Sequence, residues 1–125
     1  SEGMINAAKK RHIPTYAQFV RGTSAQEITD YTIISGTYNM HINADIEEWA
    51  SYVKASLKQL WQHTRYGLAF NMLRNDTEIK YDGLFYADPN GFLSFARKRL
   101  SPESTLRFDW PLPDFTVFVR RPEGK

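Results

Sequence analysis

The strongest constraint on the fold is an alternation of two apolar spacings along the chain. Residues 46–62 repeat apolar side chains at steps of three and four, which is typical of a helix that buries one face. Residues 31–34 and 67–73 are instead short continuous apolar runs, which are typical of buried parallel strands. Because helical and strand-like segments alternate, the sequence predicts an α/β fold rather than an all-α or all-β fold.

Capping residues predict where two of the helices begin. Asp45 is a good N-cap for the first of them, and Glu48 follows three residues later, as in a capping box. Asp88 and Pro89 predict a second helix start, because proline is tolerated at the first helical position. Both helices are therefore predicted from local chemistry as well as from apolar spacing.

The other elements are predicted from β-branched and aromatic residues. Residues 15–20 indicate a short strand, which follows a helix ending within residues 3–12. Residues 105–108 and 115–119 alternate in polarity around a proline-rich loop, which predicts an antiparallel pair. The earlier strands are joined by segments too long for hairpins, so we expect them to be parallel. The predicted sheet is thus mostly parallel, with an antiparallel strand pair at its C-terminal end.

Composition limits the class of protein. The chain has 125 residues and is 42% hydrophobic, which suits one domain with one core. We expect that domain to span residues 1–121, with a flexible tail at residues 122–125. The absence of cysteine excludes disulfide scaffolds, thiol catalysis and cysteine-based zinc sites, and it agrees with a cytoplasmic location. No apolar run approaches the roughly 20 residues that cross a membrane.

Motifs for several common chemistries are missing from the sequence. His12, His41 and His63 are scattered, and no Gly-x-Ser-x-Gly nucleophile motif accompanies them. Neither a His-x-x-x-His pair nor an Asp-rich calcium loop occurs, so no metal site is predicted. Glycine-rich phosphate-binding loops are also missing. The sequence therefore names no catalytic residue.

Basic and aromatic residues are interleaved in several segments, as they are in some proteins that bind single-stranded nucleic acid. The charge is nevertheless almost balanced, with 16 basic and 14 acidic residues and a net charge of +2. Dedicated nucleic-acid binders are usually more basic. A nucleic-acid partner is therefore disfavoured and stays an alternative.

Small and polar residues follow the apolar run at residues 31–34. Ser35 and Gly36 come directly after it, and a glycine there lets a ligand approach the backbone closely. Ligands in open α/β sheets bind beyond the carboxyl ends of parallel strands. The same residues also suit a tight turn without a ligand. Further polar groups near the two strand ends are Tyr38, Asn39 and Asn71.

Six segments then follow one another in a familiar order, at residues 1–8, 19–22, 30–36, 67–73, 84–89 and 114–120. In this order and spacing the chain resembles the C-terminal two-thirds of a class I S-adenosylmethionine-dependent methyltransferase. The resemblance covers nearly the whole chain. It implies a Rossmann-like sheet and the transfer of a methyl group from S-adenosylmethionine to an acceptor that the sequence does not identify.

The resemblance also implies a set of contacts to the cofactor. The turn after residues 15–20 would lie along the adenine, and the segment after residues 31–34 would lie beside the methionine part. Many members of the family carry an acidic residue where Thr23 stands, although the threonine hydroxyl still accepts a hydrogen bond. The implied cofactor-binding residues are Met4, Gly22, Thr23, Ser24, Ala25, Ser35 and Gly36.

Four residues would face the acceptor in such a protein: Thr37, Tyr38, Asn39 and His41. Tyr38 and Asn39 are interpreted as groups that orient the acceptor. His41 is the titratable side chain nearest to this segment and is the candidate for a base. The resemblance implies no metal.

The printed chain begins after the parts of such proteins that hold the cofactor most firmly, namely the first strand, its glycine-rich loop and an acidic residue that ends the second strand. We therefore expect it to bind the cofactor weakly or not at all and to be inactive alone. We also expect the strand at residues 31–34 to lack one neighbour and the strand at residues 15–20 to lack its usual partner. Such exposed edges favour a homodimer or a domain swap, unless a longer parent chain fills the gap. The alternatives are a non-catalytic interaction or regulatory module with this fold, and an RNA-associated domain.

Overall fold

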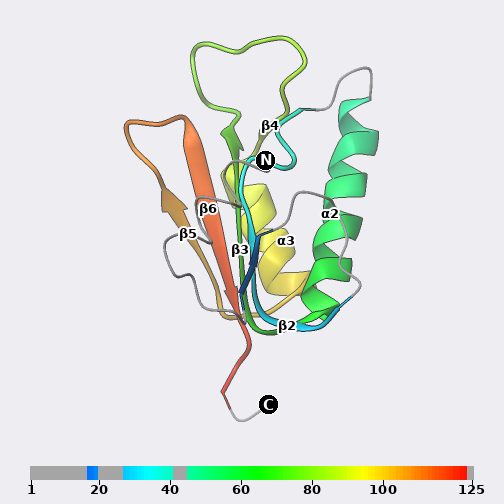
Figure 1. Cartoon of the computed structure of the whole chain (residues 1–125). Coiled ribbons are helices and arrows are strands. Elements are labelled where there is room, and N and C mark those ends of the chain that lie inside the picture. The colour runs from blue at the N-terminus through cyan, green and yellow to red at the C-terminus, as the bar shows by residue number, and fades with distance from the viewer. Residues whose placement is uncertain (1–16, 20–26, 41–44, 124–125) are drawn as a thin grey trace.

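The computed structural model describes residues 17–19, 27–40 and 45–123. Within them, six strands form one sheet in the order β1-β2-β3-β6-β5, and β4 pairs with β3 beside this path (Figure 1). The helix predicted within residues 3–12 lies outside the described residues. The elements are β1 (Ala17–Phe19), β2 (Thr29–Ile34), α2 (Ile46–Gln62), β3 (Thr64–Arg74), β4 (Tyr86–Ala87), α3 (Pro89–Arg99), β5 (Ser104–Phe108) and β6 (Asp114–Arg120).

The strand directions confirm the predicted sheet. β1, β2, β3 and β4 pair in parallel, whereas β6 pairs antiparallel with both β3 and β5. β3 is longer than the apolar run at residues 67–73 from which it was predicted, because it begins at Thr64 and ends at Arg74. β3 lies at the centre of the sheet, where it pairs with β2, β4 and β6.

One prediction about the strand edges is wrong. The strand at residues 31–34 was expected to lack a neighbour, but β2 lies between β1 and β3. Ala17 is paired with Tyr31 on one side of β2, and Tyr31 is paired with Gly67 on the other. The short segment of residues 17–19 thus occupies the position that was expected to be open. Dimerisation through strand edges stays a prediction.

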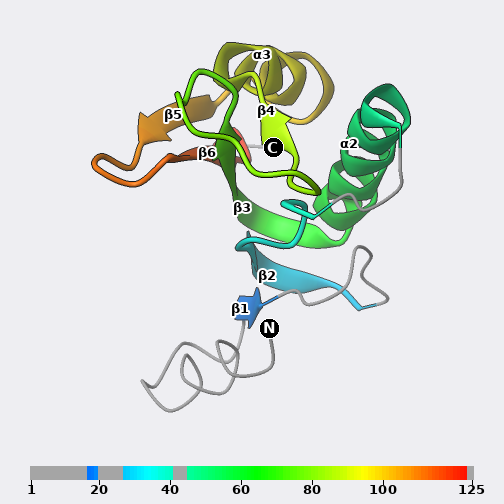
Figure 2. The same cartoon turned by 90° about the horizontal axis from the view of Figure 1, so that it is seen from above.

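The predicted helix starts are confirmed. The N–H of Glu48 donates to Oδ2 of Asp45 over 3.2 Å, which caps the N-terminus of α2. α3 begins at Pro89, although the side chain of Asp88 makes no capping hydrogen bond. Both helices lie on the same side of the sheet when the molecule is seen from above (Figure 2). No helix among the described residues is long and apolar enough to cross a membrane.

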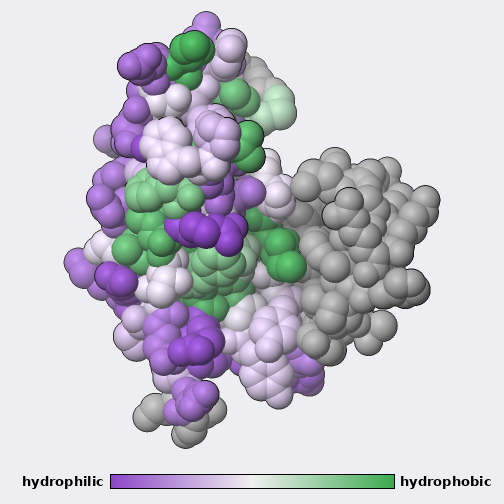
Figure 3. Space-filling model, turned by 90° about the vertical axis from the view of Figure 1, so that its left-hand side faces the viewer, coloured by the Kyte–Doolittle hydropathy of each residue, from purple (hydrophilic) through white to green (hydrophobic). Residues whose placement is uncertain are grey.

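The side of the molecule that carries β5 and β6 is only partly covered. Figure 3 shows apolar residues gathered at mid-height on this side, between hydrophilic regions above and below. Phe108 and Phe118 of these strands stay 40% and 38% exposed. The guanidinium of Arg107 lies 5.0 Å from the centre of the Phe118 ring and covers part of this apolar surface.

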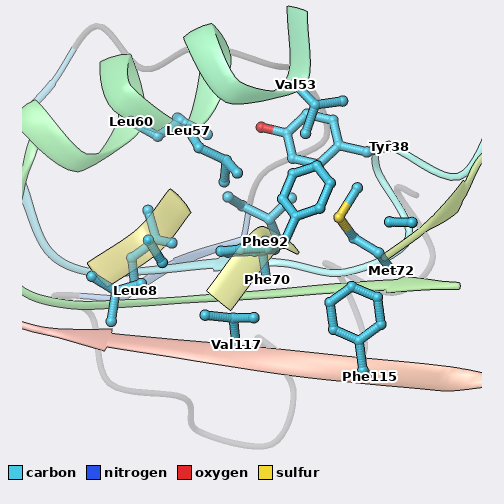
Figure 4. Packing of buried hydrophobic residues seen from close by; sticks show 14 of the residues in the cluster. Tyr38, Val53, Leu57, Leu60, Leu68, Phe70, Met72, Phe92, Phe115 and Val117 are labelled. Carbon is cyan, nitrogen blue, oxygen red and sulfur yellow. The ribbon is translucent and has the colours of Figure 1, made fainter. Parts of the chain in front are cut away.

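The core lies between the sheet and the two helices (Figure 4). Alternate residues of β3 point toward α2, and Leu68, Phe70 and Met72 are at most 3% exposed. The ring of Phe92 on α3 packs edge-on against Phe70, with 6.2 Å between ring centres. Full burial of each such side chain contributes about 1.5–3 kcal/mol. Further core residues from α2 and β6 are Val53, Leu57, Leu60, Phe115 and Val117.

Candidate functional site

The carboxyl end of β2 continues into a tight turn. Gly36 has a φ of 72°, a backbone conformation that residues with a side chain rarely adopt. The N–H of Asn39 donates to the carbonyl oxygen of Gly36 over 3.4 Å, which closes the turn. The glycine is therefore required by the backbone, and it lies at an exposed position.

Asn71 of β3 ties this turn to the neighbouring strand. Its Oδ1 accepts a hydrogen bond from the N–H of Gly36 over 2.8 Å, and its Nδ2 donates to Oγ of Ser35 over 3.2 Å. Asn71 lies on the opposite face of β3 from the core residue Phe70, because successive residues of a strand alternate. The structure thus brings Ser35, Gly36 and Asn71 together where two parallel strands end.

Asn39 adds a buried acceptor without a partner. Its side-chain Oδ1 is buried and makes no hydrogen bond, while its backbone oxygen accepts from the N–H of Phe85 over 2.6 Å. An unpaired buried acceptor costs about 1–3 kcal/mol, so native proteins contain few of them. A ligand that brings an N–H or O–H group to this oxygen would remove that cost.

Tyr38 is placed differently from the prediction that it faces the acceptor. Its ring is fully buried and points toward α2, and its hydroxyl lies 2.6 Å from Oγ of Ser56 (Figure 4). The indole N–H of Trp49 donates to the backbone oxygen of Tyr38 over 3.0 Å. Burial raises the pKa of Tyr38 to about 12. In this structure the tyrosine is a core residue that anchors the turn to α2, while Thr37 beside it stays partly exposed.

Arg74 forms a second polar cluster, at the carboxyl end of β3. Its Nε and Nη2 donate to the two carboxylate oxygens of Asp76, each over 2.8 Å, and this hydrogen bonding holds the pKa of Asp76 below its ordinary value. Its guanidinium lies 4.7 Å from the ring centre of Phe108 and 4.1 Å from that of Trp110. Nη1 is buried and has no partner. One side chain thus connects the loop after β3 to the hairpin between β5 and β6.

Comparisons with known proteins agree with the fold described above. The chain is 31% identical over 107 residues to "Putative methyltransferase Rv1506c" of Mycobacterium tuberculosis. It also superimposes on the crystal structures of magnesium protoporphyrin IX methyltransferase (ChlM) from Synechocystis PCC 6803, with TM-scores of 0.57 and 0.54 at 12% and 11% identity. The chain therefore has a methyltransferase-like fold.

The match is extensive for this chain but partial for its relatives. The methyltransferase-like fold covers 98% of this chain in both ChlM comparisons, against 61% and 56% of the ChlM chains. The sequence match covers 84% of this chain and 64% of the mycobacterial protein. The chain therefore spans about three-fifths of the length of these proteins. No protein-family profile matches it.

The described part of this methyltransferase fold contains some of the predicted site residues and not others. Ser35, Gly36, Thr37 and Asn39 lie in or beside the turn after β2, and their predicted contacts to ligands stay predictions. No group of three metal-ligating side chains occurs in residues 17–19, 27–40 and 45–123. The predicted residues outside the described part are Met4, Gly22, Thr23, Ser24, Ala25 and His41.

Sequence reasoning assigned no site role to Asn71, although it noted the residue near a strand end. The available signal was an amide within the apolar run at residues 67–73. A polar side chain in such a run needs a hydrogen-bond partner when it is buried. The structure supplies that partner in the turn after β2, which the sequence alone does not place beside β3.

Proposed function

We propose that this chain is part of an S-adenosylmethionine-dependent methyltransferase, and that the turn after β2 binds the methionine part of the cofactor. The observation that carries the proposal is the joining of Ser35 and Gly36 to Asn71 at the carboxyl ends of β2 and β3. Ligands of open α/β sheets bind at this edge. The methyltransferase-like fold and the mycobacterial relative support the same reading.

The residues at this edge fit the chemistry of that cofactor. Its methionine part carries an ammonium group, which donates hydrogen bonds, and the buried Oδ1 of Asn39 is an acceptor without a partner. The space beside Gly36 is open, since an added Cβ there would meet only Nδ2 of Asn39, at 3.9 Å. A close approach of a ligand to the backbone is therefore possible at this turn.

The proposed mechanism depends on position rather than on strong acid–base groups. When bound, the cofactor supplies a methyl group that is already activated by its sulfonium. Asn71 holds the N–H of Gly36 and the hydroxyl of Ser35 in fixed directions. Thr37, next to this turn, would orient the methyl acceptor so that its reacting atom lies in line with the methyl group. His41 remains the proposed base where the acceptor must lose a proton.

Calorimetric titration of S-adenosylhomocysteine tests the proposal. The titration uses this chain and a version extended N-terminally from the parent gene, since the chain spans about three-fifths of its relatives. We expect the extended protein to bind and this chain to bind weakly or not at all. The absence of binding by both proteins would contradict the proposal and favour a non-catalytic module with this fold.

A matched pair of variants in the extended protein tests the site itself. Asn71→Ala removes the hydrogen bonds that connect Gly36 and Ser35 to β3. We expect it to weaken binding of S-adenosylhomocysteine by about tenfold, which corresponds to one hydrogen-bonded contact. Asn90→Ala removes an exposed amide on α3 and serves as the control. Equal affinities of the two variants would place the cofactor elsewhere.

A further inference from the structure

A basic groove runs between α2 and α3. It has a volume of about 550 Å³, and its walls come from about three turns of α2 and the C-terminal part of α3. Both helices lie on one side of the sheet (Figure 2), and residues of both helices line the groove. The residues that line the groove are Ser51, Lys54, Ala55, Lys58, Gln59, Gln62, Phe95 and Arg99.

The charges in this groove are all positive. Lys54 and Lys58 lie on the α2 wall and Arg99 on the α3 wall, and no lining residue is acidic. Within residues 27–40 and 45–123, none of these three cations takes part in an ion pair; the ion pairs there involve other arginines. Three cations without acidic neighbours form a site of positive potential that attracts an anion.

One of the three cations is held in place by aromatic rings. The Nζ of Lys54 lies 5.6 Å from the ring centre of Phe92 and 5.7 Å from that of Phe95. Cation–π contacts of this kind attract the ammonium group to the ring faces. Lys54 therefore presents its charge from a preferred position in the groove and loses less side-chain entropy when an anion binds.

The shape of the groove favours an extended ligand. Ser51 and Gln62 are eleven residues apart on α2, which corresponds to a length of about 16 Å, and Lys54 and Lys58 are about 6 Å apart along the axis. Small-molecule sites bury most of their ligand, whereas this groove is open to solvent. Its lining cations come from both helices, with Lys54 and Lys58 one turn apart on α2 and Arg99 on α3.

We propose that this groove binds the phosphate backbone of single-stranded nucleic acid. A basic groove that follows the backbone is the usual basis of binding without sequence preference. The nearly balanced net charge of +2 disfavoured such a partner, but a net charge does not show how charges are distributed. The groove is separate from the turn after β2, so this proposal does not depend on the proposed methyl transfer.

The experiment measures how the 125-residue chain binds a fluorescent twelve-nucleotide oligouridylate at several salt concentrations. Three phosphate contacts to a single strand give a slope of about −2 for log affinity against log salt. Lys58→Gln and Arg99→Gln each remove one contact, so we expect each slope to become shallower by about 0.7 and affinity at about 50 mM salt to fall on the order of tenfold. Lys80→Gln, which removes an exposed cation in the loop after β3, is the control.

Four outcomes would overturn the proposal. The first is an absence of saturable binding at about 50 mM salt, and the second is a loss of affinity in the Lys80→Gln variant equal to that in the groove variants. The third is displacement of the oligonucleotide by tripolyphosphate at the same phosphate concentration. The fourth is binding of an oligoglutamate with the same dependence on Lys58 and Arg99. The third would show a site for small anions, and the fourth a surface that does not select nucleic acid. Melting temperatures of all variants show whether they are folded.

Discussion

Near the amino ends of β2 and β3, the buried hydroxyl groups of Thr32 and Thr64 are paired, whereas beyond the carboxyl ends two buried polar atoms are not. The hydroxyl oxygens of Thr32 and Thr64 lie 2.6 Å apart, and the Thr64 hydroxyl donates to the backbone oxygen of Leu60 over 2.7 Å. At the other end, Oδ1 of Asn39 and Nη1 of Arg74 are buried without partners. A third buried atom without a partner among the described residues, Oε2 of Glu103, belongs to the residue that precedes β5. Because unpaired buried groups reduce stability, the difference between the amino and carboxyl ends of β2 and β3 indicates that the amino ends stabilise the fold and that the carboxyl ends are available to a ligand.

The largest expected effect is at the paired end. Nη2 of Arg121 donates to the backbone oxygens of Trp61 and Thr64 over 2.8 and 3.0 Å, and its guanidinium lies 3.7 Å from the Trp61 ring centre. We expect Arg121→Met to lower the free energy of unfolding by about 2–3 kcal/mol, because both carbonyl groups lose a charged donor. Urea denaturation measures the change.

The neighbouring arginine provides the control for that variant. Arg120 makes an exposed ion pair with Glu103 at 3.3 Å, and such pairs contribute at most about 1 kcal/mol. We therefore expect Arg120→Met to be clearly more stable than Arg121→Met. Equal stabilities of the two variants would show that the hydrogen bonds of Arg121 do not stabilise the amino end of the sheet.

The next effect concerns the threonine pair. Thr64→Val keeps the branched shape but leaves the Leu60 oxygen and the Thr32 hydroxyl without this partner. We expect a loss of about 2 kcal/mol, as measured by thermal unfolding. Thr105→Val, at an exposed position of β5, should change stability by less than about 0.5 kcal/mol. A loss at Thr105 as large as that at Thr64 would contradict the reading of the paired end.

A smaller effect, which depends on pH, is expected at Tyr38. Its hydroxyl hydrogen-bonds Ser56, so Tyr38→Phe should cost about 1 kcal/mol at neutral pH. Burial raises the pKa from 10.0 to about 12, which means that the folded protein favours the neutral phenol. This contribution is complete below about pH 10 and is lost as the pH rises toward 12. The advantage of the wild-type chain over Tyr38→Phe should therefore shrink from pH 9 to pH 11.

An exposed tyrosine separates this effect from general alkaline unfolding. Tyr81 is 67% exposed, so Tyr81→Phe should follow the wild-type chain across the whole pH range in urea denaturation. A constant difference between the wild-type chain and Tyr38→Phe from pH 9 to pH 11 would show that the phenol of Tyr38 does not titrate as described.

The smallest effect is expected at the unpaired end. Asn39→Ala removes a buried acceptor that has no partner, so the relief of this cost offsets the lost packing. We expect the free energy of unfolding to change by less than about 0.5 kcal/mol in the absence of ligand. A loss above about 1.5 kcal/mol would show that the Asn39 amide stabilises the fold, and the contrast between the two ends would then disappear.

Local chemistry explains what could be predicted of the fold. The ends of α2 follow from Asp45, Glu48 and an apolar stripe, all of which lie within the helix or next to it. β4 could not be predicted, because a strand of two residues has no period and exists through its pairing with the end of β3. The start of β3 was missed for a related reason, since Arg65 and Tyr66 are exposed and do not extend an apolar run.

Prediction of the candidate site from the sequence was likewise limited to local patterns. Ser35 and Gly36 were recognisable, since a small residue and a glycine after an apolar strand are a local pattern. The direction of the Tyr38 ring was not, because it is decided by a contact with Ser56 that is eighteen residues away. Asn71 is likewise connected to Gly36 across thirty-five residues. Spacing along the chain contains no information about either contact.

The alternation of side chains along β3 links the core to the candidate site. Phe70 and Asn71 are adjacent in sequence but lie on opposite faces, and one inserted residue before them would exchange the two faces. The amide would then enter the apolar interior, and the phenyl ring would leave it. Single-residue insertions or deletions within β3 should thus remove stability and ligand contacts together, whereas length changes between Asp76 and Gly83 affect neither. Length variation among natural versions of this chain is accordingly expected in that loop and not in the strand.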